Sequence, residues 1–600
     1  MQTNSAPRRG RRRAIGLTIL AGLLLGGCAA TPPKDDAGPP SSVPAIPADQ
    51  GPRFPLALPE PGEALLVERA GWGLPERARP AEFSGLFSEE ADPAAGIEVR
   101  SIDLSWRQLR PTRDGGLDLG AAGQAQGMDL APLEEQLADP APFWVRLFAS
   151  GTDWAPEWVL TECATPSYGP DSDGQRHLPL WNDCVWGHLL ETYRMLLAGE
   201  SGLAEDPRYR FAYVPGGFAW AEFDADIIGE AVAAGDLDLA GYRAWHERAW
   251  TELAALLGDR AGTLVYTGED YPFGPFGADD DRFAADAVHA GLGIRTGITE
   301  LSNFHLSEAP AYASRIEANG HLSVDDAAPV HDGSRVVAAE NECYTDCGYT
   351  TDEPDLAVTL SNLKALQLRT NWLYAVPEDS RFAELPEQWD WVRLSLGQTA
   401  SSSQDAWAAL REAEDTAWAD EPAWDGIAGT RFEDPSAWPG RPIVRNLERF
   451  LTQVDRPGAI AHRSEVAVTE GLLAEDNGVA AEGLRTDRAN GNTGLVFVLD
   501  PRFVAAANAA GDGLAVEVTF WDDSASETRV LAGIDAAAVS LDAPGDAEVS
   551  PAIPGSGDNR WRTGTVLLTG PVPAEVRVER AGEDDLTARF VRVIRVPRAG

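Results

Sequence analysis

The sequence is poor in sulfur and in positive charge. Of its 600 residues five are cysteine and three are methionine, and 49 Lys and Arg face 94 Asp and Glu, a formal net charge of −45. So acidic a chain is repelled by nucleic acid and by anionic membrane surfaces, and neither is expected as a partner. No GxSxG elbow, HExxH motif or P-loop is present either, so the chemistry that those motifs carry has no support here.

Long apolar runs are also scarce, and the one that stands out lies near the N-terminus. Five arginines precede the run from Ala14 to Leu25, which is short for a membrane span. Leu25-Gly26-Gly27-Cys28 then resembles a bacterial lipobox, which predicts a lipoprotein signal over residues 1–27 and lipidation of Cys28. An ordinary secretion signal is the alternative. The mature chain, of charge about −50 without those arginines, is expected to be exported and anchored to the cell envelope through this lipid alone.

Beyond the signal, a Pro/Ala/Asp/Ser stretch over residues 28–56 predicts a disordered tether. The four remaining cysteines are even in number, which favours disulfides in an exported chain. Proximity along the chain pairs Cys163 with Cys184 and Cys343 with Cys347. A zinc site is the alternative, but paired CxxC spacing and nearby histidines are lacking.

Short strand patterns alternate with amphipathic helical runs between about Glu63 and Val376, which is typical of β-α units around a parallel sheet. Eight strands predict an α/β fold, a (β/α)8 TIM barrel over residues 57–400. An open doubly wound sheet is the alternative, but no Gly-rich phosphate fingerprint follows an early strand. The predicted strands are Ala64–Glu68, Ile97–Trp106, Phe143–Ala149, Phe211–Val214, Thr263–Tyr266, Gly293–Thr296, Arg335–Glu340 and Asn371–Ala375, and the helices between them include Leu130–Leu137, Gly187–Leu197, Leu239–Leu257, Phe283–Ala290 and Leu356–Leu368.

The composition changes towards the C-terminus. Alternating apolar segments separated by Gly, Asp and Pro predict an all-β sandwich over residues 457–600. Residues 401–456 are predicted to form helix and loop packed on the barrel, ending in an amphipathic helix in RNLERFLTQVDRPGA.

Two glutamates each follow a buried-strand pattern. Glu222 ends RFAYVPGGFAWAE after the fourth predicted strand, and Glu340 follows SRVVAA at the seventh. Gly216 and Gly217 let the backbone approach a ligand closely. The carboxyl ends of parallel strands meet at one end of a barrel, and a pair of carboxylates there is what glycosidic bond cleavage requires.

With this strand order and these glutamates, the chain resembles the retaining glycoside hydrolases of the (β/α)8 superfamily, β-galactosidase-like enzymes with an appended β-sandwich. The resemblance implies that Glu222 is the acid/base and Glu340 the nucleophile, about 5 Å apart. It also implies hydrolysis of a β-linked oligo- or polysaccharide without a cofactor.

Three alternatives stay open. Many members of the family have Asn before the acid/base where this chain has Ala221, which supports a catalytically silent, surface glycan-binding lipoprotein. Glu342 is an alternative nucleophile to Glu340. Carboxyl groups about 6.5–9.5 Å apart would instead mean an inverting enzyme.

Further residues near the strand ends are candidates for substrate binding, because aromatic faces stack on sugar rings and Arg or Asn reaches hydroxyl groups. The 19 tryptophans suit a saccharide groove or a large core. The run Asp279–Asp281 is interpreted as a solvated loop, with calcium a weak option because the EF-hand spacing is absent. The substrate-binding candidates are Trp106, Arg146, Glu269, Asn303, His305 and Trp372.

Overall fold

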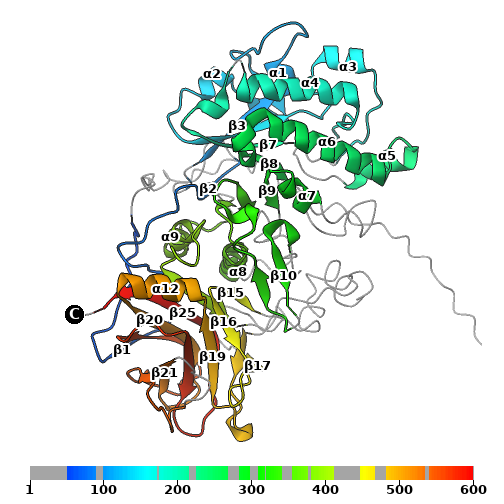
Figure 1. Cartoon of the computed structure of the whole chain (residues 1–600). Helices are drawn as coiled ribbons and strands as arrows, with labels where there is room; N and C mark the ends of the chain where they lie inside the picture. Colours follow the sequence, from blue (N-terminus) through cyan, green and yellow to red (C-terminus); the bar gives the residue numbers. More distant parts are fainter. Residues whose placement is uncertain are drawn as a thin grey trace, which may run out of the picture.

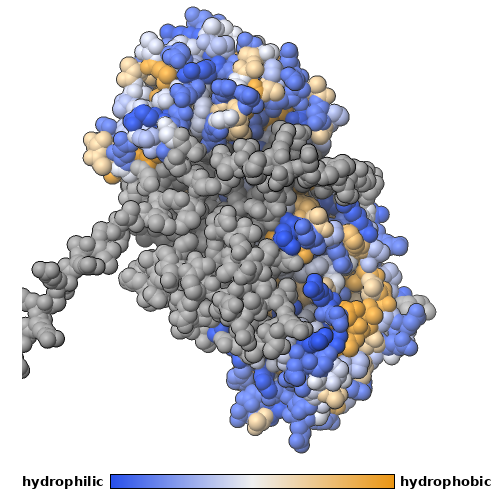
Figure 2. All heavy atoms as spheres, turned by 180° about the vertical axis from the view of Figure 1, so that it is seen from behind, coloured by the Kyte–Doolittle hydropathy of each residue, from blue (hydrophilic) through white to orange (hydrophobic). Residues whose placement is uncertain are grey.

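The computed structural model consists of a barrel followed by two antiparallel sheets (Figure 1). It describes residues 51–89, 97, 99–171, 174–199, 201–214, 225–267, 283–296, 309–317, 319–340, 354–375, 380–410, 446–466, 481–533 and 540–598. Within these ranges no helix combines the length and the hydropathy of a membrane span. Seen from behind, their surface is predominantly hydrophilic, with apolar residues in patches (Figure 2).

The barrel is a sheet of eight parallel strands in the order β2-β13-β12-β9-β8-β7-β6-β3. An isolated parallel bridge between Phe87 and Val99 joins β2 to the residue before β3, so the barrel is nearly closed. This confirms the predicted TIM-barrel class. Its strands are β2 (Gly85–Phe87), β3 (Arg100–Ser105), β6 (Phe143–Phe148), β7 (Tyr209–Val214), β8 (Leu264–Thr267), β9 (Gly293–Thr296), β12 (Val337–Ala339) and β13 (Trp372–Tyr374).

One strand of the barrel was wrongly predicted. Ala64–Val67 forms β1, but β1 pairs antiparallel with β23 (Trp561–Leu568) at the edge of a C-terminal sheet. The first barrel strand is instead β2, which is only three residues long. Because β2 takes the place of the wrongly predicted first strand, β7 is still the fourth strand of the barrel along the chain and β12 is still the seventh.

Helices cover the outside of the barrel, and most begin or end where the sequence indicates. In α6 (Leu239–Leu257), the N-cap Asp238 accepts a hydrogen bond from the Gly241 amide at 2.7 Å, and Gly258, at φ +55°, follows the last residue. The other helices of this half are α1 (Trp106–Leu109), α2 (Leu133–Gln136), α3 (Glu157–Cys163), α4 (Asp183–Tyr193), α5 (Ala225–Ala234), α7 (Phe283–His289), α8 (Pro354–Gln367) and α9 (Pro386–Ser395), and β4 (Gly123–Ala125) with β5 (Met128–Leu130) and β10 (Ser314–Ile316) with β11 (Leu322–Val324) form two hairpins.

The C-terminal half confirms the predicted antiparallel sandwich. Its two sheets enclose a core of aliphatic and aromatic residues. Helix α12 (Pro501–Ala510), which the sequence analysis did not predict, lies beside them. The larger sheet contains β1, β14 (Asp405–Ala409), β15 (Leu447–Arg449), β17 (His462–Val466), β18 (Ala481–Arg485), β20 (Asp512–Trp521), β23 and β25 (Thr587–Pro597), and the smaller contains β16 (Leu451–Val454), β19 (Gly494–Leu499), β21 (Thr528–Gly533), β22 (Glu548–Val549) and β24 (Glu575–Arg580).

The amphipathic helix predicted near residue 450 is therefore wrong. This segment supplies strands to both sheets, β15 to the larger and β16 to the smaller. The charged residues that suggested a solvated helix face are buried and paired: His321 Nδ1 lies 2.8 Å from the carboxylate of Glu448, and Arg449 donates to the Ser395 carbonyl at 2.7 Å. Strand β14, at residues 405–409, also belongs to the larger sheet, so the sandwich begins before residue 457, the start that the sequence predicts.

The barrel and the sandwich share a polar and aromatic interface. Arg592 of β25 contacts the carboxylates of Asp405 at 2.8 Å and Glu517 at 3.3 Å, and donates to the Gly73 carbonyl at 2.9 Å. Trp72 lies 4.5 Å from the ring of Trp391. Trp391 of α9 donates its indole N–H to the carboxylate of Asp405 in β14 at 2.7 Å, and both side chains are buried, so this contact joins the two bodies.

Candidate active site

The inner face of the barrel has an apolar layer and, one step towards the carboxyl ends, a polar layer. Side chains along a strand alternate between the two faces, so residues two positions apart point the same way. Trp144 and Phe211 belong to the inner apolar cluster, and two positions further stand Arg146 and Tyr213. Each of the eight strands reaches a polar or tyrosine side chain in this way: Glu89, Asp103, Arg146, Tyr213, Thr267, Arg295, Glu340 and Tyr374.

Glu340 takes its inward direction from the sheet itself. Its backbone amide donates to the Thr296 carbonyl at 3.0 Å, so the pairing of β12 with β9 continues one residue past β12. Ala338, two residues earlier, belongs to the inner apolar cluster. Glu340 is 5% exposed and buried among the groups of the polar layer.

Arg295 joins two carboxylates of this layer. Its Nη2 atom contacts the carboxylate of Glu340 and lies 3.3 Å from Oε1 of Glu89. Arg295 is 1% exposed, and its guanidinium lies over the ring of Tyr213 at 5.7 Å. Because these charges are shielded from water, their attraction is much stronger than at the surface.

Arg146 makes the second link. Its Nε atom lies 2.9 Å from Oδ1 of Asp103, and its Nη2 atom lies 2.9 Å from Oδ2 of the same carboxylate. Its Nη1 atom lies 2.5 Å from Glu89 Oε2. Burial opposes the charge of Arg146, but the attraction of Asp103 and Glu89 outweighs it and raises the pKa of Arg146. The five groups form one buried charge row, in the order Asp103, Arg146, Glu89, Arg295 and Glu340.

Tyr213 completes the row from β7. Burial raises the pKa of its hydroxyl well above 10, and the negative charge of Glu89 raises it further. The phenol therefore stays protonated at any pH at which the fold is expected to survive. A protonated hydroxyl beside the Glu89 carboxylate is suited to hydrogen bonding with a ligand rather than to acid catalysis.

Several predicted site residues lie outside the described part of the chain. They comprise the predicted acid/base, its rival nucleophile, three substrate-binding candidates, the lipidation site and the second cysteine pair: Glu222, Glu342, Glu269, Asn303, His305, Cys28, Cys343 and Cys347.

Two predicted sugar-stacking tryptophans are instead core residues. Trp106 begins α1, is fully buried, and its indole N–H donates to Thr192 at 2.9 Å. Trp372 is 1% exposed and packs edge-on against Phe83 and Phe211 inside the barrel. The prediction is wrong for both, because neither ring presents a face to a ligand at the carboxyl ends of the strands. Arg146, by contrast, lies in the charge row.

Cys163 and Cys184 form a disulfide, with a Cα–Cα distance of 5.6 Å. It joins the last residue of α3 to the second residue of α4. His188 is close enough for its ring nitrogen and the two sulfurs to lie within 4.8 Å of one another. Both sulfurs are bonded to each other, so the zinc alternative does not apply to this pair in the structure.

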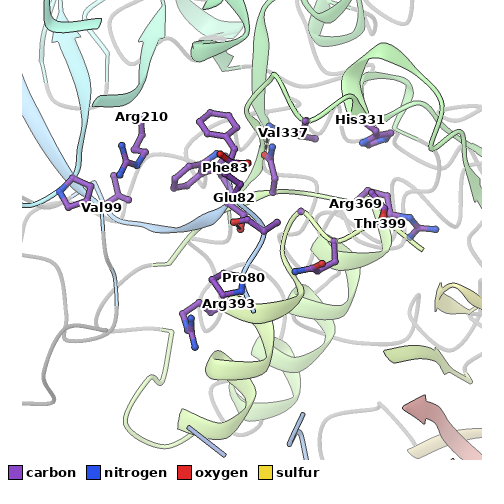
Figure 3. A pocket seen from close by; sticks show the side chains of 18 of the residues that line it. Pro80, Glu82, Phe83, Val99, Arg210, His331, Val337, Arg369, Arg393 and Thr399 are labelled. Carbon is purple, nitrogen blue, oxygen red and sulfur yellow. Dashed lines mark hydrogen bonds between the residues drawn. The ribbon is translucent and has the colours of Figure 1, made fainter. Parts of the chain in front are cut away.

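A separate cavity of about 1250 Å³ lies at the opposite end of the barrel. Its lining includes Val99, Arg210 and Val337, which stand at or next to the amino ends of their strands, and Arg393 of α9 (Figure 3). None of the five members of the charge row lines it. In TIM-barrel enzymes the chemistry occurs at the carboxyl ends, so this cavity is not the candidate site.

Glu89, Asp103 and Arg295 are not among the site residues predicted from the sequence. A usable signal exists for all three, since each stands two positions beyond an inward-facing residue of a barrel strand: Phe87, Ser101 and Gly293. For Glu89 that signal depended on finding β2, a strand of three residues.

Comparisons with known proteins do not assign the chain to a family. No family model matches the chain, and no curated protein does. Among solved structures it is similar to the isomalto-dextranase of Arthrobacter globiformis T6 complexed with panose, with a TM-score of 0.30 and 10% identity over 83% of this chain and 90% of that chain. A likeness at this TM-score carries no argument about function. The functional argument rests on the geometry of the charge row.

Proposed function

We propose that the chain is a glycoside hydrolase that cleaves a β-linked oligo- or polysaccharide with retention of configuration. The carrying observation is the buried charge row at the carboxyl end of the barrel, in which Arg295 contacts Glu340 at the end of the seventh strand. In this fold that end is where the chemistry occurs.

Glu340 is suited to be the nucleophile. A nucleophilic carboxylate must be ionised, and a cation in contact favours the ionised form. Arg295 supplies that cation from the neighbouring strand β9. The same contact restricts the carboxylate to one orientation, which helps to hold it in line with the anomeric carbon.

A glycosidase also needs a carboxylic acid that is protonated before reaction. Glu89 shares Arg295 with Glu340 and also contacts Arg146, so each of its two oxygens faces a guanidinium. Glu89 is therefore poorly placed to reach the oxygen of a scissile bond. The proposed acid/base is instead Glu222, on the sequence that continues from the fourth strand.

In the proposed reaction Glu340 attacks the anomeric carbon while Glu222 gives a proton to the departing oxygen. A glycosyl ester of Glu340 results. Glu222 then removes a proton from a water molecule, which displaces Glu340 and restores it. The row holds three carboxylates and two guanidiniums, so its net negative charge favours the positive charge that develops on the sugar.

The test is hydrolysis of aryl β-glycosides and plant and marine polysaccharides by a chain beginning at residue 51, compared with Glu340→Ala, Glu222→Ala and Glu342→Gln. We expect Glu340→Ala to lose at least about a thousandfold in kcat and azide to restore turnover with an inverted glycosyl azide as product. Azide on Glu222→Ala should give the retained azide, and Glu342→Gln should stay active. Saccharide binding with no turnover in the parent would favour the silent glycan-binding protein instead.

We also propose that the mature protein is exported and lipid-anchored through Cys28, as the lipobox-like sequence suggests. Replacing Cys28 by Ala should move the protein from the membrane fraction to the soluble fraction of a bacterial host. Unchanged membrane association in Cys28→Ala would refute the anchor.

A further inference from the structure

The disulfide between α3 and α4 has a third metal-ligating group beside it. The sulfurs of Cys163 and Cys184 and a ring nitrogen of His188 all lie within 4.8 Å of one another. Cys184 and His188 stand four residues apart on α4, so their side chains share one face of the helix. In the described part of the chain, this is the one group of three or more histidine, cysteine or acidic side chains that has the spacing of a metal site.

The neighbours of His188 hold its ring beside the sulfurs. The ring lies 4.8 Å from that of Trp158 in an edge-on contact, and Trp158 donates its indole N–H to the Arg110 carbonyl at 3.0 Å. On another side, Nε2 of His188 lies 3.5 Å from the carboxylate of Glu162, which Arg113 contacts at 3.0 Å. A carboxylate beside a metal-ligating histidine orients the ring and makes it a stronger ligand.

The separations are compatible with a tetrahedral zinc ion once the two sulfurs are no longer bonded to each other. With Zn–S near 2.3 Å and Zn–N near 2.0–2.1 Å, two sulfurs on one ion lie about 3.8 Å apart, and a sulfur and a nitrogen about 3.6 Å apart. The Cα atoms of Cys163 and Cys184 are 5.6 Å apart. Rotation of the two side chains therefore suffices to separate the sulfurs, and the helices keep their places.

We propose that Cys163, Cys184 and His188 form a redox-gated zinc site, which the disulfide closes and a dithiol reductant opens. The reductant passes two electrons and two protons to the disulfide, which becomes two thiols, and the reductant itself becomes a disulfide. Zn²⁺ then displaces both thiol protons and binds the two thiolates and the imidazole, with water as the fourth ligand. The zinc keeps its charge throughout. The site is independent of the proposed glycosidase.

Both states of the site join the same two helices. The disulfide connects the last residue of α3 to the second residue of α4, and zinc connects the same two positions. Cys163, Cys184 and His188 are all partly exposed, so a reductant and a metal ion have access to them. The link between α3 and α4 is therefore kept in reducing surroundings, where a disulfide alone is lost.

The test uses the full chain with Cys28→Ser, Cys343→Ser and Cys347→Ser, so that Cys163 and Cys184 are its only cysteines. This parent is prepared oxidised, and also reduced with dithiothreitol that is then removed without air. Each form is titrated with zinc chloride in competition with a chromophoric chelator. We expect the reduced form to bind one zinc per chain and to release about two protons at pH 7. The oxidised form should bind none.

Matched variants locate the ligands. His188→Ala removes one of three protein ligands, so it should weaken zinc binding by more than the roughly 10–100-fold that the loss of an outer partner costs. Glu162→Gln should weaken zinc binding within that range. Cys163→Ser should abolish the binding of one zinc per chain. His462→Ala is the control, because His462 lies in β17 of the sandwich with a side chain that is 49% exposed, and it should leave the affinity unchanged.

Three outcomes would overturn the proposal. The first is a reduced parent that keeps the circular dichroism of the oxidised form and binds no zinc. The second is equal zinc affinity in His188→Ala and the parent, because two thiols alone would then account for the metal. The third is a loss of folded structure on reduction that zinc does not restore, because the site requires both helices to keep their places.

Discussion

Arg295 and Glu89 connect the two halves of the charge row, and the two residues have different expected roles, one in catalysis and one in stability. Arg295 contacts Glu340, the proposed nucleophile, so its loss should appear in catalysis. Glu89 contacts both guanidiniums, so its loss should appear in stability. Their variants separate the chemical and the structural roles of one network.

Arg295→Met should lower kcat/KM by about 10²–10³-fold, the usual cost of removing one preorganised electrostatic partner. Without the cation the pKa of Glu340 rises, so the acid limb of the kcat/KM profile should move to higher pH. Arg315→Met is the control, because Arg315 is 73% exposed in its side chain and lies in the β10–β11 hairpin. An unmoved acid limb would contradict the proposed role of Arg295.

Glu89→Gln should destabilise the fold by about 3–5 kcal/mol, because two buried guanidiniums each lose an ionic partner. Urea denaturation, monitored by tryptophan fluorescence, measures the change in unfolding free energy. Glu157→Gln serves as comparison: its side chain is 77% exposed and its ion pair with Arg107 lies at the surface, so it should cost less than about 1 kcal/mol. Similar costs for the two variants would contradict the burial argument.

At this scale the structure places Arg146 in β6 and Glu340 directly after β12, as the strand pattern predicts, while their roles stay predictions; Trp106 and Trp372 lie in the core. A tryptophan beside a strand end can face a ligand or the core, and the choice depends on what packs over it. For Trp106 the deciding partner is Thr192 of α4, 86 residues away. Such distant contacts leave no local trace in the sequence.

At the scale of elements, α6 carries a buried histidine in an aromatic cluster. His246 is fully buried, and its ring lies 4.4 Å from that of Trp245 and 4.9 Å from that of Phe283. Burial lowers its pKa well below 6.5, and Arg243 lowers it further. His246 is therefore neutral in the folded state.

This makes α6 sensitive to acid. Below pH 6.5 the unfolded chain binds a proton at His246 that the folded chain does not, so stability is full above pH 6.5 and falls as pH decreases. Between pH 8 and pH 5 the parent should lose about 2 kcal/mol more than His246→Leu, from about 1.4 kcal/mol per pH unit below 6.5. Denaturation curves at both pH values measure the difference. A parallel loss in parent and variant would show that other groups govern the acid response.

Elements with a strong local pattern were predicted well and elements defined by distant partners were not. The limits of α6 are those predicted from its amphipathic pattern. The helix predicted near residue 450 failed because Glu448 and Arg449 imitate a solvated helix face, although both are buried through contacts with residues more than 50 positions away. Strand β2 was missed because three residues are too few to show a pattern.

At the scale of the whole molecule, an N-terminal strand completes a C-terminal sheet. Ala64 pairs with Val566 and Val67 with Thr563, and β1 covers part of the sandwich core through Ala64 and Leu66. Beyond β1, Arg77 makes two contacts of 2.7 Å with Asp512. The segment before the barrel is thus part of the sandwich.

A chain that begins at residue 70 should therefore be less stable in its C-terminal half than one that begins at residue 51. It loses the four residue pairs of β1 and exposes the edge of β23. Hydrogen exchange resolved by mass spectrometry should show faster exchange in residues 561–568, with the barrel strands little changed. Equal protection of β23 in both chains would mean that β1 contributes nothing measurable.

The pairing of β1 with β23 also limits how such a protein can evolve. Proteins with barrel and sandwich domains are often regarded as cassettes that recombination joins or exchanges at a linker. Here a crossover anywhere between residues 68 and 560 gives the sandwich an edge strand from one parent and the adjoining strand from the other. The two ancestral sequences must agree at β1 and β23 for the product to fold, so the halves are expected to have been inherited together rather than shuffled.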